Sequence, residues 1–127
     1  MNAFLMAALG GAVGASGRYA VGMLAGHLHS GSFPLGTFTV NVVGSFVLGV
    51  LAGLMAFTWS PTPEMRAFIV VGVLGGFTTF SAFSLDAMLL IERGRLLLAA
   101  GYVVSTVFVG IGGLFLGLRL VRAIFGP

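Results

Sequence analysis

The chain contains no cysteine and no lysine, and only 7% of its 127 residues are charged. The absence of cysteine excludes disulfides, thiolate metal sites and thiol nucleophiles. Because a soluble domain carries roughly a quarter charged residues, this chain lacks the means to cover a water-facing surface. Its hydrophobic content of 58% also excludes intrinsic disorder. The composition therefore predicts an integral membrane protein of the all-α class.

Long apolar stretches predict a single domain of four transmembrane helices, at residues 4–25, 36–59, 65–91 and 95–124. A helix of about 20 apolar residues crosses a hydrocarbon core of about 30 Å. The connecting loops are short, so neighbouring helices are expected to run antiparallel. Glycine pairs at four-residue spacing predict close helix packing. These pairs are Gly10 and Gly14, Gly22 and Gly26, Gly49 and Gly53, Gly72 and Gly76, and Gly113 and Gly117.

All cationic side chains apart from histidine are arginines, and they are spread along the chain. This distribution predicts anchors at helix ends and no nucleic-acid surface. The predicted topology divides them equally between the two sides of the membrane, with Arg66, Arg119 and Arg122 opposed to Arg18, Arg93 and Arg95. Because arginine bias in short loops normally fixes orientation, an equal division predicts insertion in both directions and an antiparallel homodimer.

Polar side chains inside the spans are candidate functional groups, because a bilayer tolerates them only when they are paired or face a cavity. Two sets share a helix face by their spacing, Thr37, Asn41 and Ser45 in the second span and Tyr102, Ser105 and Thr106 in the fourth. Hydrogen bonds between helices are an equally good interpretation for Thr37 and Ser45. A position at the membrane interface is the alternative for Tyr102. Asn41 is expected to face water or a ligand.

The centre of the third span, residues 75–84, reads Gly-Gly-Phe-Thr-Thr-Phe-Ser-Ala-Phe-Ser. Paired glycines followed by β-branched residues weaken a helix, so this segment predicts a break. Backbone groups freed at membrane depth are tolerated where they are buried in protein or line a cavity or ion site. Phe80 and Phe83 would share a face, and their positive ring edges attract a small anion, although such pairs are more often simple packing.

Three segments together, residues 17–19 (Gly-Arg-Tyr), 36–41 (Gly-Thr-Phe-Thr-Val-Asn) and 75–84, resemble the CrcB/Fluc family of fluoride channels. The resemblance covers essentially the whole chain. It implies a dual-topology antiparallel homodimer with two fluoride pores, a broken third helix and a structural sodium ion (Na+) at the dimer centre. It further implies passive export of cytoplasmic fluoride across the plasma (inner) membrane of a prokaryote. Such export requires no catalytic group, so no enzyme activity is expected.

The resemblance also assigns site residues. Phe80 and Phe83 would line each pore, and Asn41 would donate its amide hydrogens to fluoride. The backbone carbonyls of Gly75 and Thr78 would hold sodium. The remaining pore donors would be Ser81, Tyr102, Thr37, Ser105 and Thr106, with Arg18 near the vestibule mouth. Ala82 stands where family members commonly have threonine, so one hydroxyl of this polar track is absent.

Three other functions are weighed against a fluoride channel. A small multidrug exporter needs an intramembrane carboxylate, typically in the first span, and this chain has none there. A structural scaffold would explain the glycine packing but not the setting of Asn41 and Phe80. A membrane enzyme would need a base or a metal cluster, whereas His27 and His29 lie in a loop without nearby carboxylates and are expected to be solvated.

Overall fold

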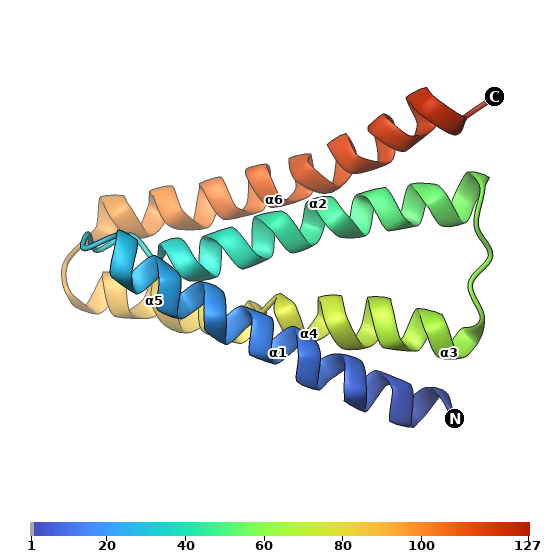
Figure 1. Ribbon diagram of the computed structural model, residues 1–127. Coiled ribbons are helices and arrows are strands. Elements are labelled where there is room, and N and C mark those ends of the chain that lie inside the picture. Colours follow the sequence, from blue (N-terminus) through green and yellow to red (C-terminus); the bar gives the residue numbers. More distant parts are fainter. Residues whose placement is uncertain (1) are drawn as a thin grey trace.

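The computed structural model describes residues 2–127, and its regular elements are all helices (Figure 1). They follow in the order α1 (Ala3–Leu28), α2 (Leu35–Phe57), α3 (Pro63–Arg66), η1 (Ala67–Leu74), α4 (Gly75–Phe77), α5 (Phe80–Glu92) and α6 (Leu96–Phe125). The elements from α3 to α5 form one composite segment. No strand occurs among residues 2–127, so the predicted all-α class is confirmed.

Within residues 2–127, three stretches are long and apolar enough to cross a membrane: Leu35–Phe57, Pro63–Glu92 and Leu96–Phe125. They make the chain a multi-pass membrane protein. α1 is a continuous helix of 26 residues, but Arg18 and its many glycines lower its hydropathy. The expectation that α1 also crosses the membrane therefore stays a prediction.

The helices form two closely packed pairs. α2 runs along α6, and α1 runs along η1; these two contacts are the most extensive in the chain. The composite segment changes its partner partway, because α4 contacts α1 whereas α5 contacts α6. Both chain termini lie at the same end as the α2–α3 loop, opposite the α5–α6 turn (Figure 1). The junction of α4 and α5 is thus the point where the two pairs meet.

Glycines allow the backbones of each pair to touch. A Cβ atom at Gly10 would overlap the carbonyl oxygen of Phe68, and one at Gly49 would overlap that of Leu114. Such contact replaces side-chain interdigitation in membrane helices. The predicted packing role is confirmed at Gly10, Gly14, Gly49, Gly53, Gly72, Gly76 and Gly117. Within residues 2–127 a Cβ atom at Gly22 or Gly26 would meet nothing within 4 Å, so the packing role stays a prediction at these two positions.

The first half of the composite segment is a π-helix, which the sequence did not predict. η1 covers eight residues, Ala67–Leu74. Its apolar run carries no signal that separates a π-helix from an α-helix, because both would bury the same kind of side chain against α1. π-helix is rare, and where it occurs it frequently lies at functional sites.

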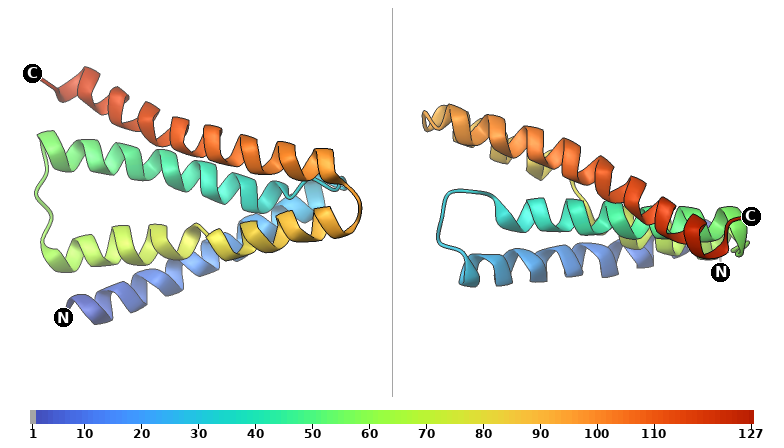
Figure 2. Two further views of the ribbon diagram at one scale, coloured as in Figure 1. Left: turned by 180° about the vertical axis from the view of Figure 1, so that it is seen from behind. Right: turned by 90° about the horizontal axis from the view of Figure 1, so that it is seen from above.

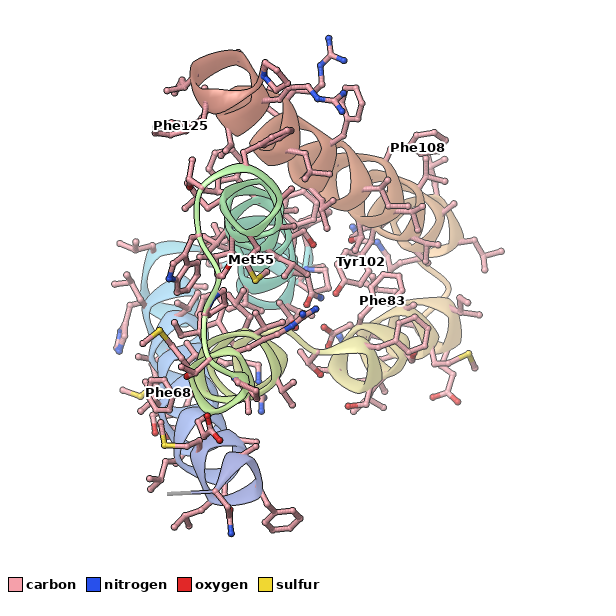
Figure 3. The ribbon with its side chains drawn as sticks, turned by 90° about the vertical axis from the view of Figure 1, so that its right-hand side faces the viewer. Met55, Phe68, Phe83, Tyr102, Phe108 and Phe125 are labelled. Carbon is pink, nitrogen blue, oxygen red and sulfur yellow. The ribbon has the colours of Figure 1, made fainter. Side chains whose placement is uncertain are left out.

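The surface of the chain is strongly apolar. Of the apolar side chains that the structure describes, only a few are buried, namely Val40, Leu74, Leu90, Ala99, Tyr102 and Val121. Toward the α5–α6 turn, α5 and α6 diverge from α1 and α2 (Figure 2). Phe108 and Phe125 point outward and are 72% and 52% exposed (Figure 3). Exposed apolar surface of this extent requires cover by lipid chains or by further protein.

Candidate functional site

The composite segment breaks at two threonines. α4 ends at Phe77, Thr78 and Thr79 are extended, and α5 begins at Phe80. The predicted break is therefore confirmed, in the stretch whose glycine and β-branched residues disfavour helix. Thr79 is the N-cap of α5, since its Oγ1 accepts the backbone N–H of Ala82 at 3.1 Å.

Asn41 of α2 bonds the backbone of Thr79 in both directions. Its Nδ2 donates to the Thr79 carbonyl oxygen at 3.0 Å, and the Thr79 N–H donates to its Oδ1 at 2.8 Å. The side chain thus satisfies two backbone groups that the break removes from the helical ladder, as a membrane interior requires. A primary amide has two N–H donors, so one remains for a ligand.

Arg18 of α1 contacts the other end of the break. The side chain is half-buried, and its Nε donates to the carbonyl oxygen of Gly76 at 3.0 Å. The positive guanidinium therefore lies at the C-terminal end of the first half-helix, where the helix dipole is negative. The prediction of a helix-end anchor is wrong for Arg18, because its hydrogen bond lies in the interior of the span Pro63–Glu92.

A cavity of about 320 Å³, here called the break cavity, adjoins the break. α2, α5, α6 and the break itself supply its polar and aromatic lining: Asn41, Ser45, Thr78, Thr79, Phe80, Phe83 and Thr106. The rings of Phe80 and Phe83 are tilted, with centroids 5.7 Å apart. The Thr106 Oγ1 is buried and has no hydrogen-bond partner within residues 2–127. Within that range no charged side chain lines the cavity.

Tyr102 of α6 is fully buried within the protein, so its side chain does not face lipid. Its hydroxyl donates to Oδ2 of Asp86 at 3.2 Å. Its ring packs against Phe83 and Phe33, with centroid distances of 5.2 and 5.4 Å. Phe83 and Tyr102 lie toward each other between α5 and α6 (Figure 3). Asp86 was not predicted as the partner of Tyr102, although it is the only carboxylate within an otherwise uncharged run from residue 67 to 91.

Like Tyr102, three other predicted pore residues lie outside the lining of the break cavity. Thr37 lines a second cavity of about 400 Å³ together with Arg18, and Thr79 lines both cavities. Ser81 is exposed on the first turn of α5, with its Oγ 3.3 Å from the Thr79 Oγ1. The Ser105 Oγ donates to the Tyr102 carbonyl oxygen of its own helix at 3.3 Å.

Gly75 and Thr78, whose carbonyls are the predicted sodium ligands, lie at the two ends of α4. Gly75 opens α4 and is exposed. Thr78 follows α4, and its Oγ1 and N–H both donate to the carbonyl oxygen of Leu74, at 2.9 and 3.0 Å. Since Thr78 lies between α4 and α5, its own carbonyl stands outside both helices. Residues 2–127 contain no group of three or more His, Asp or Glu side chains placed to hold a metal ion.

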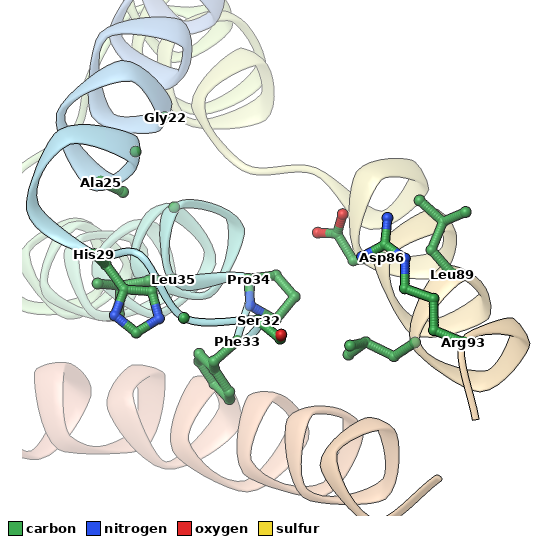
Figure 4. A pocket seen from close by; sticks show the side chains of 14 residues that line it. Gly22, Ala25, His29, Ser32, Phe33, Pro34, Leu35, Asp86, Leu89 and Arg93 are labelled. Atoms are coloured by element: carbon green, nitrogen blue, oxygen red, sulfur yellow. The ribbon is translucent and has the colours of Figure 1, made fainter. Parts of the chain in front are cut away.

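A third cavity, of about 330 Å³, lies beside the α1–α2 loop (Figure 4). His29 lines it on one side, and Asp86 and Arg93 line it on the other. The prediction of a solvated loop histidine is wrong for His29, because its Nε2 is buried without a hydrogen-bond partner within residues 2–127.

The site combines three features of the composite segment and its neighbours. An interrupted span brings irregular backbone, neutral hydrogen-bond donors and aromatic rings around one cavity. Irregular backbone within a membrane is a recurring feature of ion sites.

Comparison with known proteins gives the family. A model of the family described as "CrcB-like protein, Camphor Resistance (CrcB)" matches residues 5–118, so the chain belongs to the CrcB family. Similar proteins named "Fluoride-specific ion channel FluC" occur in Rhodospirillum centenum, at 55% identity over 96% of this chain and 97% of the relative. Those of Agrobacterium fabrum and Paracoccus denitrificans are 50% and 46% identical, covering 94% and 98% of this chain and 96% and 98% of the relatives. The resemblance seen in the sequence is confirmed.

Proposed function

We propose that the chain is the subunit of a fluoride-selective channel through which cytoplasmic fluoride leaves the cell passively. Asn41, Phe80, Phe83 and Thr106 converge from three helices on the break cavity, and this convergence is the observation that carries the proposal. Membership of the CrcB family and the names of the relatives support it. A channel of this kind performs no chemical step, so the protein is not an enzyme.

The proposed path suits a small, strongly hydrated anion. A narrow pore must replace the water of fluoride with preorganised donors. Asn41 contributes its free N–H, Thr106 its hydroxyl, and Phe80 and Phe83 their positive ring edges. Arg18, beside the second cavity, adds positive potential at the vestibule.

Further donors extend the path on either side of the break cavity: Thr37, Ser81, Tyr102 and Ser105. In this path Tyr102 exchanges the Asp86 carboxylate for fluoride as its hydrogen-bond acceptor. A negative-inside potential of 100 mV drives a single anion outward with about 2.3 kcal/mol, so no energy-coupling site is needed.

The proposed assembly is an antiparallel homodimer with two pores, in the plasma (inner) membrane of a prokaryote and with α1 as a fourth span. Phe80 lines the break cavity and is nevertheless 79% exposed, so a second copy is needed to complete the wall. Because Arg18 bonds the break, it no longer counts among the arginines near the span ends. Those that remain are Arg66, Arg119 and Arg122 on one side of the membrane and Arg93 and Arg95 on the other. This near balance favours insertion in both directions.

The proposal includes a structural sodium ion at the dimer centre. The Gly75 and Thr78 residues fit this role because Gly75 is exposed and the Thr78 carbonyl lies outside the helical ladders. Carbonyl oxygens at the end of a half-helix suit a hard cation, and antiparallel symmetry would double their number. A bound cation would supply positive potential near the anion path.

Fluoride efflux from liposomes reconstituted with the purified protein tests the function directly. A fluoride electrode follows release under a potassium gradient with valinomycin, and chloride release is followed in parallel. Rapid fluoride release without chloride release supports the proposal. Absence of fluoride release from folded protein that elutes as one species on a sizing column would reject it.

A further inference from the structure

Gly44 of α2 provides the space in which the side chain of Thr78 is seated. Gly44 is buried, and a Cβ atom placed on it would overlap Cγ2 of Thr78. The same Cβ atom would lie 3.5 Å from Cδ2 of Phe77, an ordinary contact. Gly44 therefore leaves the space that one methyl group at the break, Cγ2 of Thr78, occupies.

This methyl group belongs to the first of the two extended residues. The Thr78 Oγ1 is fixed by its hydrogen bond to Leu74 O at 2.9 Å, so the rotation that would move Cγ2 away from α2 breaks that bond. The next residue, Thr79, is bonded in both directions by Asn41. Asn41 and Gly44 are three residues apart and share a face of α2. One face of α2 thus fixes both residues of the break.

We propose that Gly44 is a positioning residue for conduction: by seating the Thr78 methyl, it sets the path of the backbone from α4 into α5 and hence the place of Phe80 and Phe83 in the break cavity. The inference rests on the proposed channel function. Gly44 acts through Thr78 and is itself outside the lining of the break cavity.

The contact at Gly44 differs in kind from those at Gly10 and Gly49. At Gly10 and Gly49 the nearest atoms to an added Cβ are backbone carbonyl oxygens of Phe68 and Leu114. No side-chain substitution relieves an overlap with backbone. At Gly44 the overlapping atom is a methyl group, and Thr78→Ser removes that atom while keeping the hydroxyl bonded to Leu74.

A double-mutant cycle tests the inference, with fluoride efflux from liposomes as the readout. The proteins are the unaltered chain, Gly44→Ala, Thr78→Ser and the double variant. Gly44→Ala is expected to lower the efflux rate about tenfold or more, because overpacking shifts the backbone. In the Thr78→Ser background, Gly44→Ala is expected to change the efflux rate by less than about twofold, because serine leaves free the space that the Thr78 methyl group occupied. Gly49→Ala, combined with the same Thr78→Ser change, is the matched control and is not rescued.

Thermal unfolding of the same proteins in detergent accompanies the efflux assay. If Gly44→Ala fails to fold, recovery of folded, conducting protein in the double variant still supports the inference. An equal loss of efflux whether or not Thr78→Ser is present overturns it, and so does unaltered efflux in Gly44→Ala. An unaltered chain that does not conduct rejects the proposed function itself, which is a separate result.

Discussion

Replacement of Asn41 by alanine tests how much the Asn41 side chain contributes to holding the backbone at the break. The substitution removes the hydrogen bonds of 2.8 and 3.0 Å between this side chain and the Thr79 backbone. Interhelical hydrogen bonds in membranes contribute about 0.6 kcal/mol on average and at most about 1.7 kcal/mol. Two backbone groups left buried and unpaired would instead cost about 1–3 kcal/mol each.

The surroundings of Thr79 decide between these magnitudes. Thr79 lines both the break cavity and the second cavity, so water can reach the freed N–H and C=O groups. We therefore expect Asn41→Ala to lower the free energy of unfolding by about 1–3 kcal/mol, from two bonds at the membrane values. Fluoride efflux is expected to fall by about tenfold or more, which corresponds to about 1.4 kcal/mol in the barrier.

Asn41→Asp distinguishes the structural role from the role toward an anion. An ionised aspartate still accepts the Thr79 N–H, but it places negative charge beside the Thr79 carbonyl and in the anion path. Its efflux is expected to be lower than that of Asn41→Ala even though one bond is kept.

Ser45→Ala is the control for both Asn41 variants, because Ser45 lines the same cavity one turn further along α2. Liposome efflux and denaturant unfolding measure the two quantities. The reasoning is refuted if Asn41→Ala matches the unaltered chain in both, or if Asn41→Asp conducts as fast as Asn41→Ala.

Three further substitutions address other parts of the site and the fold. Phe80→Ile removes the aromatic ring, so it should abolish or sharply reduce fluoride efflux and leave the elution position of the protein on a sizing column unchanged; normal efflux would remove Phe80 from the proposed pore. Thr106→Val replaces a hydroxyl that has no hydrogen-bond partner within residues 2–127, so fluoride efflux should fall while the free energy of unfolding stays the same or rises slightly. A large loss of stability would show instead that the hydroxyl makes a structural hydrogen bond. Gly49→Val forces a side chain against Leu114 O and should cost about 1–3 kcal/mol of stability, measured by denaturant unfolding; an unchanged midpoint would show that α2 and α6 can separate freely.

The sequence was sufficient for features that depend on local physical properties. Long uncharged runs predicted the helices that are apolar enough to span a membrane, because length and hydropathy are properties of each segment alone. The break followed from Gly75-Gly76 and the two threonines after Phe77, since these residue types weaken any helix. The spacing of Phe80 and Phe83 also placed both rings correctly on one side of α5.

Features that depend on how the helices pair were not predictable in the same way. The bond from Arg18 to Gly76 joins residues far apart in the chain, and it exists only because α1 packs along the third segment. The bond from Tyr102 to Asp86 likewise requires α5 to lie against α6 after the break. Thr37, Asn41 and Ser45 are evenly spaced along α2. Thr37 and Ser45 nevertheless line different cavities, because Asn41 contacts the break between them.

The hydrogen bonds at the break determine which residues report cleanly on an anion. Asn41 and Arg18 were assigned from the sequence to the ion path, but each also satisfies backbone groups that the break leaves unpaired. A substitution of Asn41 or Arg18 therefore changes the backbone at the break and the proposed ion path at the same time. The Thr106 hydroxyl lines the same cavity and has no such bond within residues 2–127. An unpaired buried hydroxyl carries a desolvation cost that only a ligand, water or a second chain can offset. Thr106 is therefore the position at which a change in fluoride efflux is least confounded by a change in the fold.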